Sequence, residues 1–307
     1  MNKQKKKEKP FLLYGIFGCP LGHTLSPAMQ EAAFEHFRIP AFYLTLETLP
    51  HDFKKIMRNL RAAHACVLDG FNLTVPYKEK VMPFLDGITP EAKAVGAVNT
   101  VFKKNKKWIG ANTDVYGFVT ALKEEAGFQA KGKTAVILGA GGAAKAVAYG
   151  LASSGIKGIY IANRHPQRAM KLARALLKLF PHLTLGVLDF DACCLGSAIS
   201  QVDLVVNATS VGLKSETQAL IPDAWIPKAG KKQKLFYDLI YHRAETGFMK
   251  LARKKGHKTL GGLGMLLYQG AKAFEYWTGR KAPVEIMKKK LIQNVRATHR
   301  VAPTAKD

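Results

Sequence analysis

The stretch KTAVILGAGGAAKAVAYGLASSG (residues 133–155) sets the architecture of the second half of the chain. A short apolar run (residues 134–138), typical of a buried strand, leads directly into glycines and then into an alanine-rich helical segment. Gly139, Gly141 and Ala144 fit the pattern G-x-G-x-x-A. The first glycine allows a tight turn, the second lets a pyrophosphate approach the backbone, and the alanine permits close helix–strand packing. The stretch predicts a dinucleotide site with phosphate on free N–H groups of the helix N-terminus.

The next predicted strand, GIYIANR, bears on the choice between NAD and NADP. An NAD site usually has an acidic residue near the end of this strand, which binds the ribose 2′-hydroxyl. Asn163 and Arg164 stand there instead, and Arg168 follows one turn later. Two guanidinium groups suit a 2′-phosphate, so the sequence favours NADP. Solvent-exposed arginines after a strand are the alternative interpretation.

Upstream, strands and helices alternate. Apolar runs predict strands at residues 11–18 and 41–47 and a third that ends near Asn72, with helices between them. Ser26 is expected to cap the first of these helices, with Pro27 at its first position. This β-α-β-α-β order implies a parallel sheet covered by helices.

The stretch NLTVPYK (residues 72–78) places polar groups at the end of the third strand, where Asn72 and Thr74 alternate on one face. Pro76 is expected to end the strand and open a helix, because proline has no N–H to donate and its fixed φ suits a first helical turn. Lys78 would then lie where the helix dipole disfavours its charged form, which suits proton transfer. A surface lysine is the alternative interpretation.

Later segments complete the outline. Residues 98–114 predict two strands around a Lys/Asn turn, and Asp114 is expected to cap the helix that follows. Further strands are predicted in DLVVNATSVG (residues 203–212) and LFYDLIY (residues 235–241). The last strongly apolar segment, residues 259–279, is a predicted helix on which Gln269 lies off the apolar stripe. Gln269 is therefore a candidate site residue.

Length and charge limit the class of protein. A chain of 307 residues can form two domains. A formal net charge of +25 would suit nucleic acid, but the lysine clusters fall in segments that read as tails (the lysines at 288–290 among them), a hairpin turn, a loop and a helix end. These clusters have no interleaved aromatic residues of the kind that single-strand binders use. We expect steering of small anionic ligands, and no nucleic-acid partner.

Apolar segments and cysteines bear on location and metals. No apolar run approaches the length of a membrane span, and the first residues, MNKQKKKEKP, do not precede a signal-type segment, so we expect a cytoplasmic protein without a membrane partner. The four cysteines are Cys19, Cys66, Cys193 and Cys194. They lack metal-ligand spacing, so reduced thiols and no metal are expected.

Nine segments, in order, resemble one family, the shikimate dehydrogenases, which reduce 3-dehydroshikimate to shikimate with NADPH in chorismate and aromatic amino-acid biosynthesis. The segments are GCPLGHTLSPAMQ, GFNLTVPYKEKV, EAKAVGAVNTV, IGANTDVYGF, VILGAGGAAKAV, IANRHPQRA, VVNATSVG, FYDLIY and GGLGMLLYQGAKAFEYWTG. They cover nearly the whole chain apart from its two ends, and their combination is specific.

The resemblance implies roles for residues at matching positions. The implied catalytic residues are Lys78 and its partner carboxylate Asp114. The implied substrate-binding residues are Thr24 and Ser26 for the carboxylate, Asn72, Thr74, Asn99 and Gln269 for the ring hydroxyls, and Tyr241. The implied NADP-binding residues are Gly139, Ala140, Gly141, Gly142 and Ala143 for the diphosphate, Asn163, Arg164 and Arg168 for the adenosine phosphate, and Thr209 and Gly262 near the nicotinamide.

The resemblance also implies an α/β architecture of two domains around a cleft. An open, mostly parallel substrate-binding sheet would span residues 1–114, completed by C-terminal helices in 262–307, and a Rossmann-like NADP domain would span 115–261. The protein would be a monomer or a homodimer.

Alternatives remain open. Thr24 replaces the serine more usual in the family, and its extra methyl group alters the fit around the substrate carboxylate. A quinate/shikimate dehydrogenase with a different substrate or NAD preference is therefore the alternative enzyme. From other classes, a non-enzymatic dinucleotide sensor and a nucleic-acid-binding protein are the alternatives.

Overall fold

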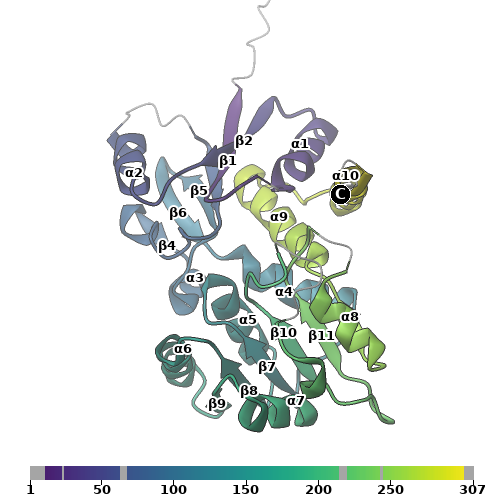
Figure 1. Cartoon of the computed structure of the whole chain (residues 1–307). Helices are drawn as coiled ribbons and strands as arrows, with labels where there is room; N and C mark the ends of the chain where they lie inside the picture. Colours follow the sequence, from purple (N-terminus) through teal and green to yellow (C-terminus); the bar gives the residue numbers. More distant parts are fainter. Residues whose placement is uncertain (1–10, 23, 63–67, 214–219, 243–244, 301–307) are drawn as a thin grey trace, which may run out of the picture.

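The structure, a computed structural model, describes residues 11–22, 24–62, 68–213, 220–242 and 245–300 (Figure 1). Two six-stranded sheets organise these residues, with α4 and α9 lying between them in Figure 1. The first sheet contains β1 (Leu12–Gly18), β2 (Ala41–Glu47), β3 (Gly70–Leu73), β4 (Gly87–Ile88), β5 (Thr100–Lys104) and β6 (Lys107–Ala111). The second contains β7 (Thr134–Leu138), β8 (Gly158–Ala162), β9 (Thr184–Leu188), β10 (Leu204–Asn207), β11 (Leu235–Asp238) and β12 (Lys258–Leu260).

The first sheet has the strand order β2-β1-β3-β5-β6-β4. Its first three strands are parallel, as the β-α-β-α-β order predicts, whereas β5 runs antiparallel to both β3 and β6. The β5–β6 hairpin turns at Asn105 and Lys106, which both have positive φ. Such a pair of residues matches the right-handed twist of the flanking strands. The predicted Lys/Asn turn is confirmed.

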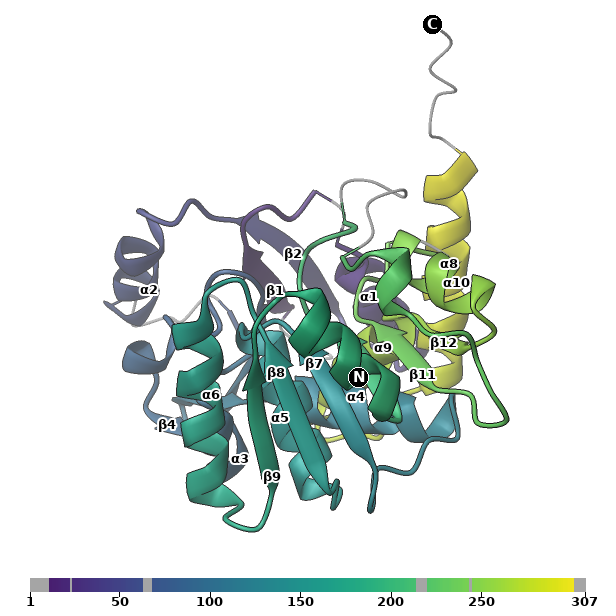
Figure 2. The ribbon, with the colours of Figure 1, turned by 60° about the horizontal axis from the view of Figure 1, so that its bottom comes forward.

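The second sheet has the order β12-β11-β10-β7-β8-β9, and all of its pairs are parallel. The direction of winding reverses between β7 and β10. In open α/β sheets, ligands bind at the carboxyl ends of the two strands where this reversal occurs. Figure 2 shows β9 and α6 at one edge of this sheet and β11, β12 and α8 at the other. The predicted Rossmann-like fold is confirmed, and it directs attention to the loops after β7 and β10.

Helices cover both sheets and connect them. They are α1 (Ser26–His36), α2 (Phe53–Ala62), α3 (Pro90–Val95), α4 (Thr113–Glu124), α5 (Gly142–Ser153), α6 (Pro166–Leu179), α7 (Ser197–Gln201), α8 (Gly247–Lys254), α9 (Leu263–Thr278) and α10 (Val284–Arg300). Short turns of helix, η1 (Met82–Phe84), η2 (Ala192–Gly196) and η3 (Asp223–Trp225), lie in connections. Within the described ranges, no helix has the length and apolar character that crossing a membrane requires.

The last two helices return to the first sheet. Phe274 of α9 and Met287 and Leu291 of α10 share one buried core with Tyr14 of β1 and Phe34 of α1. The first half of α9 packs closely on α4. A Cβ atom on Gly117 would lie 2.6 Å from the carbonyl oxygen of Met265, so glycine is required there. The division into domains, with boundaries at residues 114 and 262 and C-terminal helices that complete the first domain, stays a prediction.

Four local predictions are wrong. Leu25, not Ser26, is the N-cap of α1, so Ser26 is the first helical residue and is buried. Asn112, not Asp114, caps α4 by accepting a hydrogen bond from the N–H of Val115. No helix opens at Pro76, because residues 75–81 form turns before η1. The lysines at 288–290 lie within α10 and not in a tail. Cys66 lies outside the described residues.

Candidate active site

A cleft of ≈ 1100 Å³ lies between the carboxyl ends of the two sheets. This volume slightly exceeds the roughly 300–1,000 Å³ usual for one small ligand, as expected for a dinucleotide beside a second molecule. The residues of the predicted site that line it are Ser26, Asn72, Thr74, Lys78, Asn99, Asp114, Ala140, Gly141, Gly142, Ala143, Arg168, Tyr241, Gly262 and Gln269. Thr24, Gly139, Asn163, Arg164 and Thr209 are not among the lining residues.

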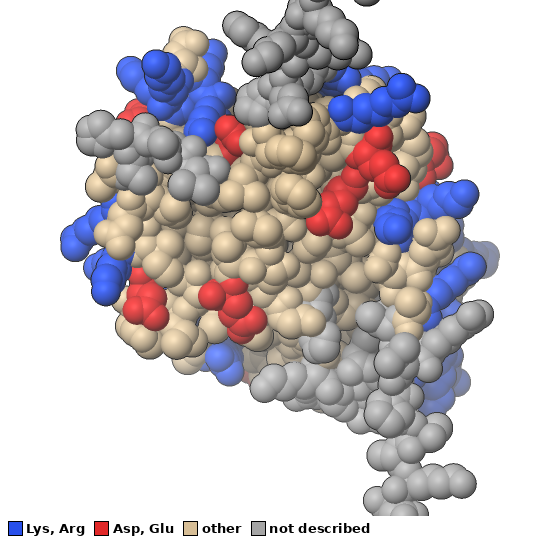
Figure 3. Space-filling model, turned by 90° about the horizontal axis from the view of Figure 1, so that it is seen from above, with Lys and Arg blue, Asp and Glu red and all other residues tan. Residues whose placement is uncertain are grey.

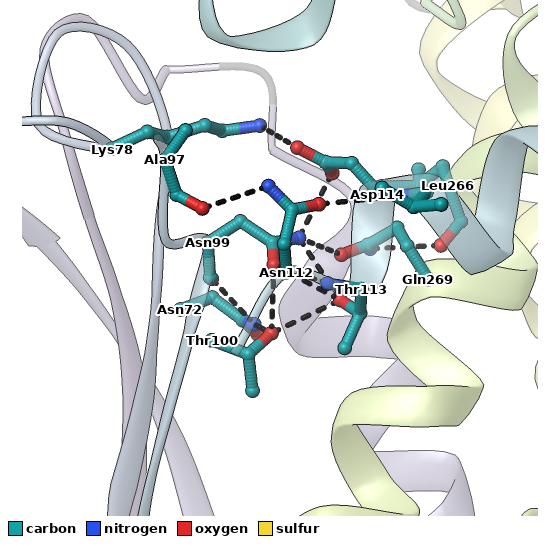
Figure 4. A network of polar contacts seen from close by, with 11 residues as sticks. Asn72, Lys78, Ala97, Asn99, Thr100, Asn112, Thr113, Asp114, Leu266 and Gln269 are labelled. Atoms are coloured by element: carbon teal, nitrogen blue, oxygen red, sulfur yellow. Dashed lines mark hydrogen bonds and ion pairs between the residues drawn. The ribbon is translucent and has the colours of Figure 1, made fainter. Parts of the chain in front are cut away.

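Lys78 and Asp114 meet in this cleft. The Nζ atom of Lys78 lies 2.5 Å from Oδ2 of Asp114, and the two side chains are only 15% and 6% exposed (Figure 4). Local structure explains why the carboxylate is free for this contact. Asn112 caps α4, so Asp114 at the second position of the helix does not. On the other side, the carbonyl of Lys78 accepts a hydrogen bond of 2.7 Å from the N–H of Val98, which fixes the turn. The expected pair is therefore formed without the expected helix.

Asn99 connects this pair to α9. Its Nδ2 lies 2.9 Å from Oδ1 of Asp114, 2.9 Å from the hydroxyl of Thr113 and 3.2 Å from Oε1 of Gln269. Its Oδ1 accepts a hydrogen bond of 2.7 Å from the N–H of Thr113. The two hydrogens of the amide group are thus shared among three acceptors. Asn99 and Lys78 together hold both oxygens of the Asp114 carboxylate in place.

Asn72 lies under the site with its polar atoms engaged by the protein. Its Oδ1 accepts a hydrogen bond of 2.7 Å from the hydroxyl of Tyr43, and its Nδ2 donates to Thr100 Oγ1 and to the carbonyl of Asn99. Thr100 Oγ1 in turn lies 3.0 Å from Thr113 Oγ1. Sequence reasoning missed Tyr43, Thr100 and Thr113. The pairing of Asn72 with Thr100 is a matter of antiparallel register, for which the sequence has no local signal.

Tyr241 borders the same cleft. Burial, together with the negative charge of Asp114, raises the pKa of the Tyr241 phenol to about 12. The phenol is therefore neutral near pH 7 and can donate a hydrogen bond to a ligand. Thr24 does not line the cleft, but its hydroxyl accepts a long hydrogen bond of 3.4 Å from the N–H of Ser26, which does.

The loop after β7, predicted to bind the diphosphate, lines another wall of the cleft. Gly139 has a φ of +116°, and a Cβ atom there would lie 3.0 Å from the carbonyl oxygen of Ala208. Gly141 is the N-cap of α5 and has no side chain to satisfy the first N–H groups of that helix. A Cβ atom on Gly141 would meet nothing within 4 Å, so its backbone is open to a ligand. Free N–H groups at a helix N-terminus fit a diphosphate.

The remaining residues that the sequence predicts to bind the cofactor lie on nearby segments. Arg164 and Arg168 are exposed at the end of β8 and the start of α6, while Asn163 Nδ2 donates to the carbonyl of His165. Two exposed guanidinium groups beside the diphosphate loop fit a nucleotide with a 2′-phosphate. Thr209 donates its hydroxyl to Oδ1 of Asn207, 2.8 Å away, and so shapes the loop after β10. A Cβ atom on Gly262 would lie 2.1 Å from the carbonyl oxygen of Leu239, so glycine is required there.

Comparison with known proteins gives concordant matches along the chain. Residues 16–101 match the shikimate dehydrogenase substrate binding domain, residues 121–243 the shikimate / quinate 5-dehydrogenase family, and residues 262–292 the shikimate 5'-dehydrogenase C-terminal domain. The shikimate dehydrogenase (NADP(+)) of Desulforamulus reducens is 42% identical over 281 residues, which are 92% of this chain and 94% of the relative.

Two solved structures are also similar. The shikimate 5-dehydrogenase of Thermus thermophilus, in complex with NADP(H) and shikimate, has a TM-score of 0.78 and 35% identity. That match covers 92% of this chain and 99% of the other. The quinate dehydrogenase of Corynebacterium glutamicum, in complex with NAD, has a TM-score of 0.81 and 30% identity over the same shares.

Proposed function

Because the chain belongs to the shikimate dehydrogenase family, we propose that it catalyses the reversible, NADP-dependent reduction of 3-dehydroshikimate to shikimate. The observation that carries this proposal is the Lys78–Asp114 pair, held 2.5 Å apart in a cleft whose other wall is the glycine loop. The reaction belongs to chorismate and aromatic amino-acid biosynthesis.

Lys78 is the proposed proton donor and acceptor. Reduction of a ketone gives an alkoxide, which needs a proton, and bound NADPH supplies the hydride. The Lys78 ammonium stabilises the growing negative charge on the oxygen and then donates a proton to it. Asp114 orients the ammonium, because its Oδ2 lies 2.5 Å from Nζ of Lys78. In the opposite direction, the neutral amine of Lys78 accepts the hydroxyl proton of shikimate.

Polar side chains around the pair are proposed to hold the substrate. A small polyol acid needs hydroxyl and amide partners, and Ser26, Thr74 and Gln269 present such groups to the cleft. Tyr241 offers a phenol with a pKa of about 12, which is therefore protonated near neutral pH. Asn99 is proposed to contact the substrate while it fixes Asp114. Asn72 contributes mainly through Asn99 and Thr100, because its amide group is already bonded to both.

A quinate/shikimate dehydrogenase is the second candidate. It is favoured by Thr24, whose hydroxyl contacts the N–H of Ser26 and which carries a methyl group that serine lacks, and by the likeness to a quinate dehydrogenase in complex with NAD. Steady-state rates on shikimate and on quinate, each with NADP and with NAD, separate the two. We expect the highest kcat/KM for shikimate with NADP. A higher value for quinate or for NAD would favour the second candidate, and no turnover with any combination would contradict both.

The basic charge does not require a nucleic-acid function. Lys and Arg lie mostly around the margin of the face in Figure 3, with Asp and Glu between them and uncharged residues in the middle. We expect no sequence-dependent shift of nucleic acid in a gel at physiological salt, and tight binding there would contradict this view. Cytoplasmic location and a monomeric or homodimeric state stay predictions from the sequence.

A further inference from the structure

We propose that Glu79 and Lys145 are positioning residues that form an ion pair across the cleft and hold the Lys78 turn against α5. The Nζ atom of Lys145 lies 2.9 Å from Oε1 of Glu79, and both residues line the cleft. Glu79 comes from the turn after β3 of the first sheet, and Lys145 comes from the helix that follows β7 of the second. The inference rests on the proposed function, because it concerns the geometry of the same site.

Each member of the pair lies close in sequence to a part of the proposed site, Glu79 to Lys78 and Lys145 to the glycine loop. Glu79 follows Lys78, so two successive side chains form ion pairs, one with Asp114 of α4 and one with Lys145 of α5. The stem of Lys78 also lies over the start of α5, with its Cδ atom 3.4 Å from where a Cβ atom on Gly142 would be. The N–H of Lys145 donates to the carbonyl of Gly141, so its side chain leaves the first turn of this helix.

The apolar contact beside the ion pair does not by itself fix the position of the Lys78 turn along α5. Val95 and Ala97 of the first-sheet side share a small buried cluster with Val115 of α4 and Ala146 of α5. Short apolar side chains bring two surfaces together but are non-directional, so they do not fix a position along the surface. An ion pair next to Ala146 sets that position, because its distance and direction are both defined.

Removal of Lys145 and removal of Glu79 should affect the site differently. Lys145 is 17% exposed and Glu79 is 52% exposed, so solvent screens the pair and its effect on stability is small. Its effect on rate is larger, because a small misplacement of a catalytic group is costly. Removal of Lys145 also leaves the Glu79 carboxylate unpaired beside the loop proposed to bind diphosphate, and like charges repel. Removal of Glu79 leaves no such charge.

A double-mutant cycle tests the inference. We expect Glu79→Gln and Lys145→Met each to lower kcat for shikimate oxidation about tenfold, with the KM for shikimate changed less than about twofold. Lys145→Met alone should raise the KM for NADP, about fivefold, whereas Glu79→Gln should not. The double variant should be no slower than the slower single variant, because each side chain acts through the other. Lys145→Arg should retain most of kcat.

Asp223 and Lys255 provide a matched control. They lie 2.8 Å apart with exposures of 48% and 18%, almost the values of the cleft pair, and neither lines the cleft. Asp223→Asn and Lys255→Met should leave kcat within about twofold of the parent. Three results would overturn the proposal: unchanged kcat in both cleft variants, losses that multiply in the double variant, or equal losses in the control pair.

Failure of the proposed function gives a different result. A parent protein that turns over neither shikimate nor quinate contradicts the assigned reaction and leaves the pair testable by NADPH fluorescence titration. In that titration, Lys145→Met should weaken binding about fivefold, and adding Glu79→Gln should restore it, since the unpaired carboxylate is then gone. Equal weakening in the presence and absence of Glu79 would overturn the pair.

Discussion

The two walls of the cleft are built in opposite ways. The wall proposed to bind the substrate, the substrate wall, consists of side chains from β3, β5, α4 and α9 that are buried and joined by hydrogen bonds, with Asn99 at the centre. The wall proposed to bind the cofactor, the cofactor wall, consists of the backbone of one continuous loop, Ala140 to Ala143, and of exposed arginines beside it. Proton transfer needs a few side-chain atoms at fixed positions, whereas an anion needs only open N–H groups and nearby positive charge. Mutations should therefore act on kcat at one wall and on cofactor binding at the other.

The largest effect is expected on the substrate wall. Lys78→Ala should lower kcat by roughly 10²-fold or more, because the proton donor is lost, and should change NADP affinity little. Steady-state kinetics with shikimate and a separate NADPH titration measure the two quantities. An unchanged kcat would contradict the role of Lys78, and a matching loss of NADP affinity would break the separation of the two walls.

On the cofactor wall, the two glycines of the loop should behave differently. Gly139→Ala should lower the free energy of unfolding by about 1–3 kcal/mol, because alanine is strained at a φ of +116° and its Cβ would press on Ala208. Gly141 has a φ of −87° and open space around the position of a Cβ atom. Gly141→Ala should therefore change the free energy of unfolding by less than about 0.5 kcal/mol, and it should weaken NADPH binding. Urea unfolding and NADPH titration test both. Equal stability losses would show that the loop is not strained at Gly139.

Arg164→Ala should weaken NADPH binding about tenfold and NADH binding hardly at all, because a charge-assisted contact to the 2′-phosphate is lost. The exposed Arg174, further along α6, is a suitable control of the same residue type. Its alanine variant should bind both cofactors like the parent. If Arg164→Ala weakens both cofactors equally, the 2′-phosphate contact is refuted and the preference for NADP needs another source.

The smallest effect is expected for the ion pair of Arg61 and Asp86, which lies away from the cleft. Its contribution to the free energy of unfolding is a baseline for the ion pairs within the cleft. Asp86 accepts two hydrogen bonds from Arg61, of 2.5 and 2.7 Å, and one from the N–H of Trp108. Arg61 first, and then Trp108, lowers the pKa of Asp86 to about 2. Because the folded-state pKa is below the unfolded value of about 3.9, the stabilisation is full above that value and is lost as the pH falls to about 2.

Asp86→Asn should therefore lower the free energy of unfolding by at most about 1 kcal/mol at pH 7, since the pair is partly exposed. The difference from the parent should disappear near pH 2. Urea unfolding at several pH values measures it. A difference that persists or grows at low pH would contradict the sign of this linkage.

Local sequence patterns predicted the fold of the cofactor wall better than that of the substrate wall, for a physical reason. The strand, glycine loop and helix at residues 133–155 are consecutive, so their pattern is readable locally. The substrate wall depends on register between strands far apart in sequence, and so Tyr43, Thr100 and Thr113 were not predicted. The resemblance to a family supplied Lys78 and Asp114, which local reasoning alone left as a surface lysine and a helix cap.

Errors at helix ends arose from neighbouring residues with similar propensities. Asn112 and Asp114 are both good N-cap residues, and the choice between them depends on Ala97, whose carbonyl accepts a hydrogen bond of 2.9 Å from Asn112. Likewise, Pro76 is compatible with a turn as well as with a first helical position. In each case a contact distant in sequence, or the path of the following chain, decides between two locally acceptable structures.

The close approach of α4 and α9 at Gly117 has a consequence for protein engineering. A side chain there would press on Gln269 and on the carbonyl of Met265, and so would move an amide that contacts Asn99. A library intended to widen the substrate range should therefore keep residue 117 as glycine and vary Tyr241, which lines the cleft, and Thr24, which contacts Ser26. Cofactor preference can be varied independently at residues 163–168, which lie on another segment.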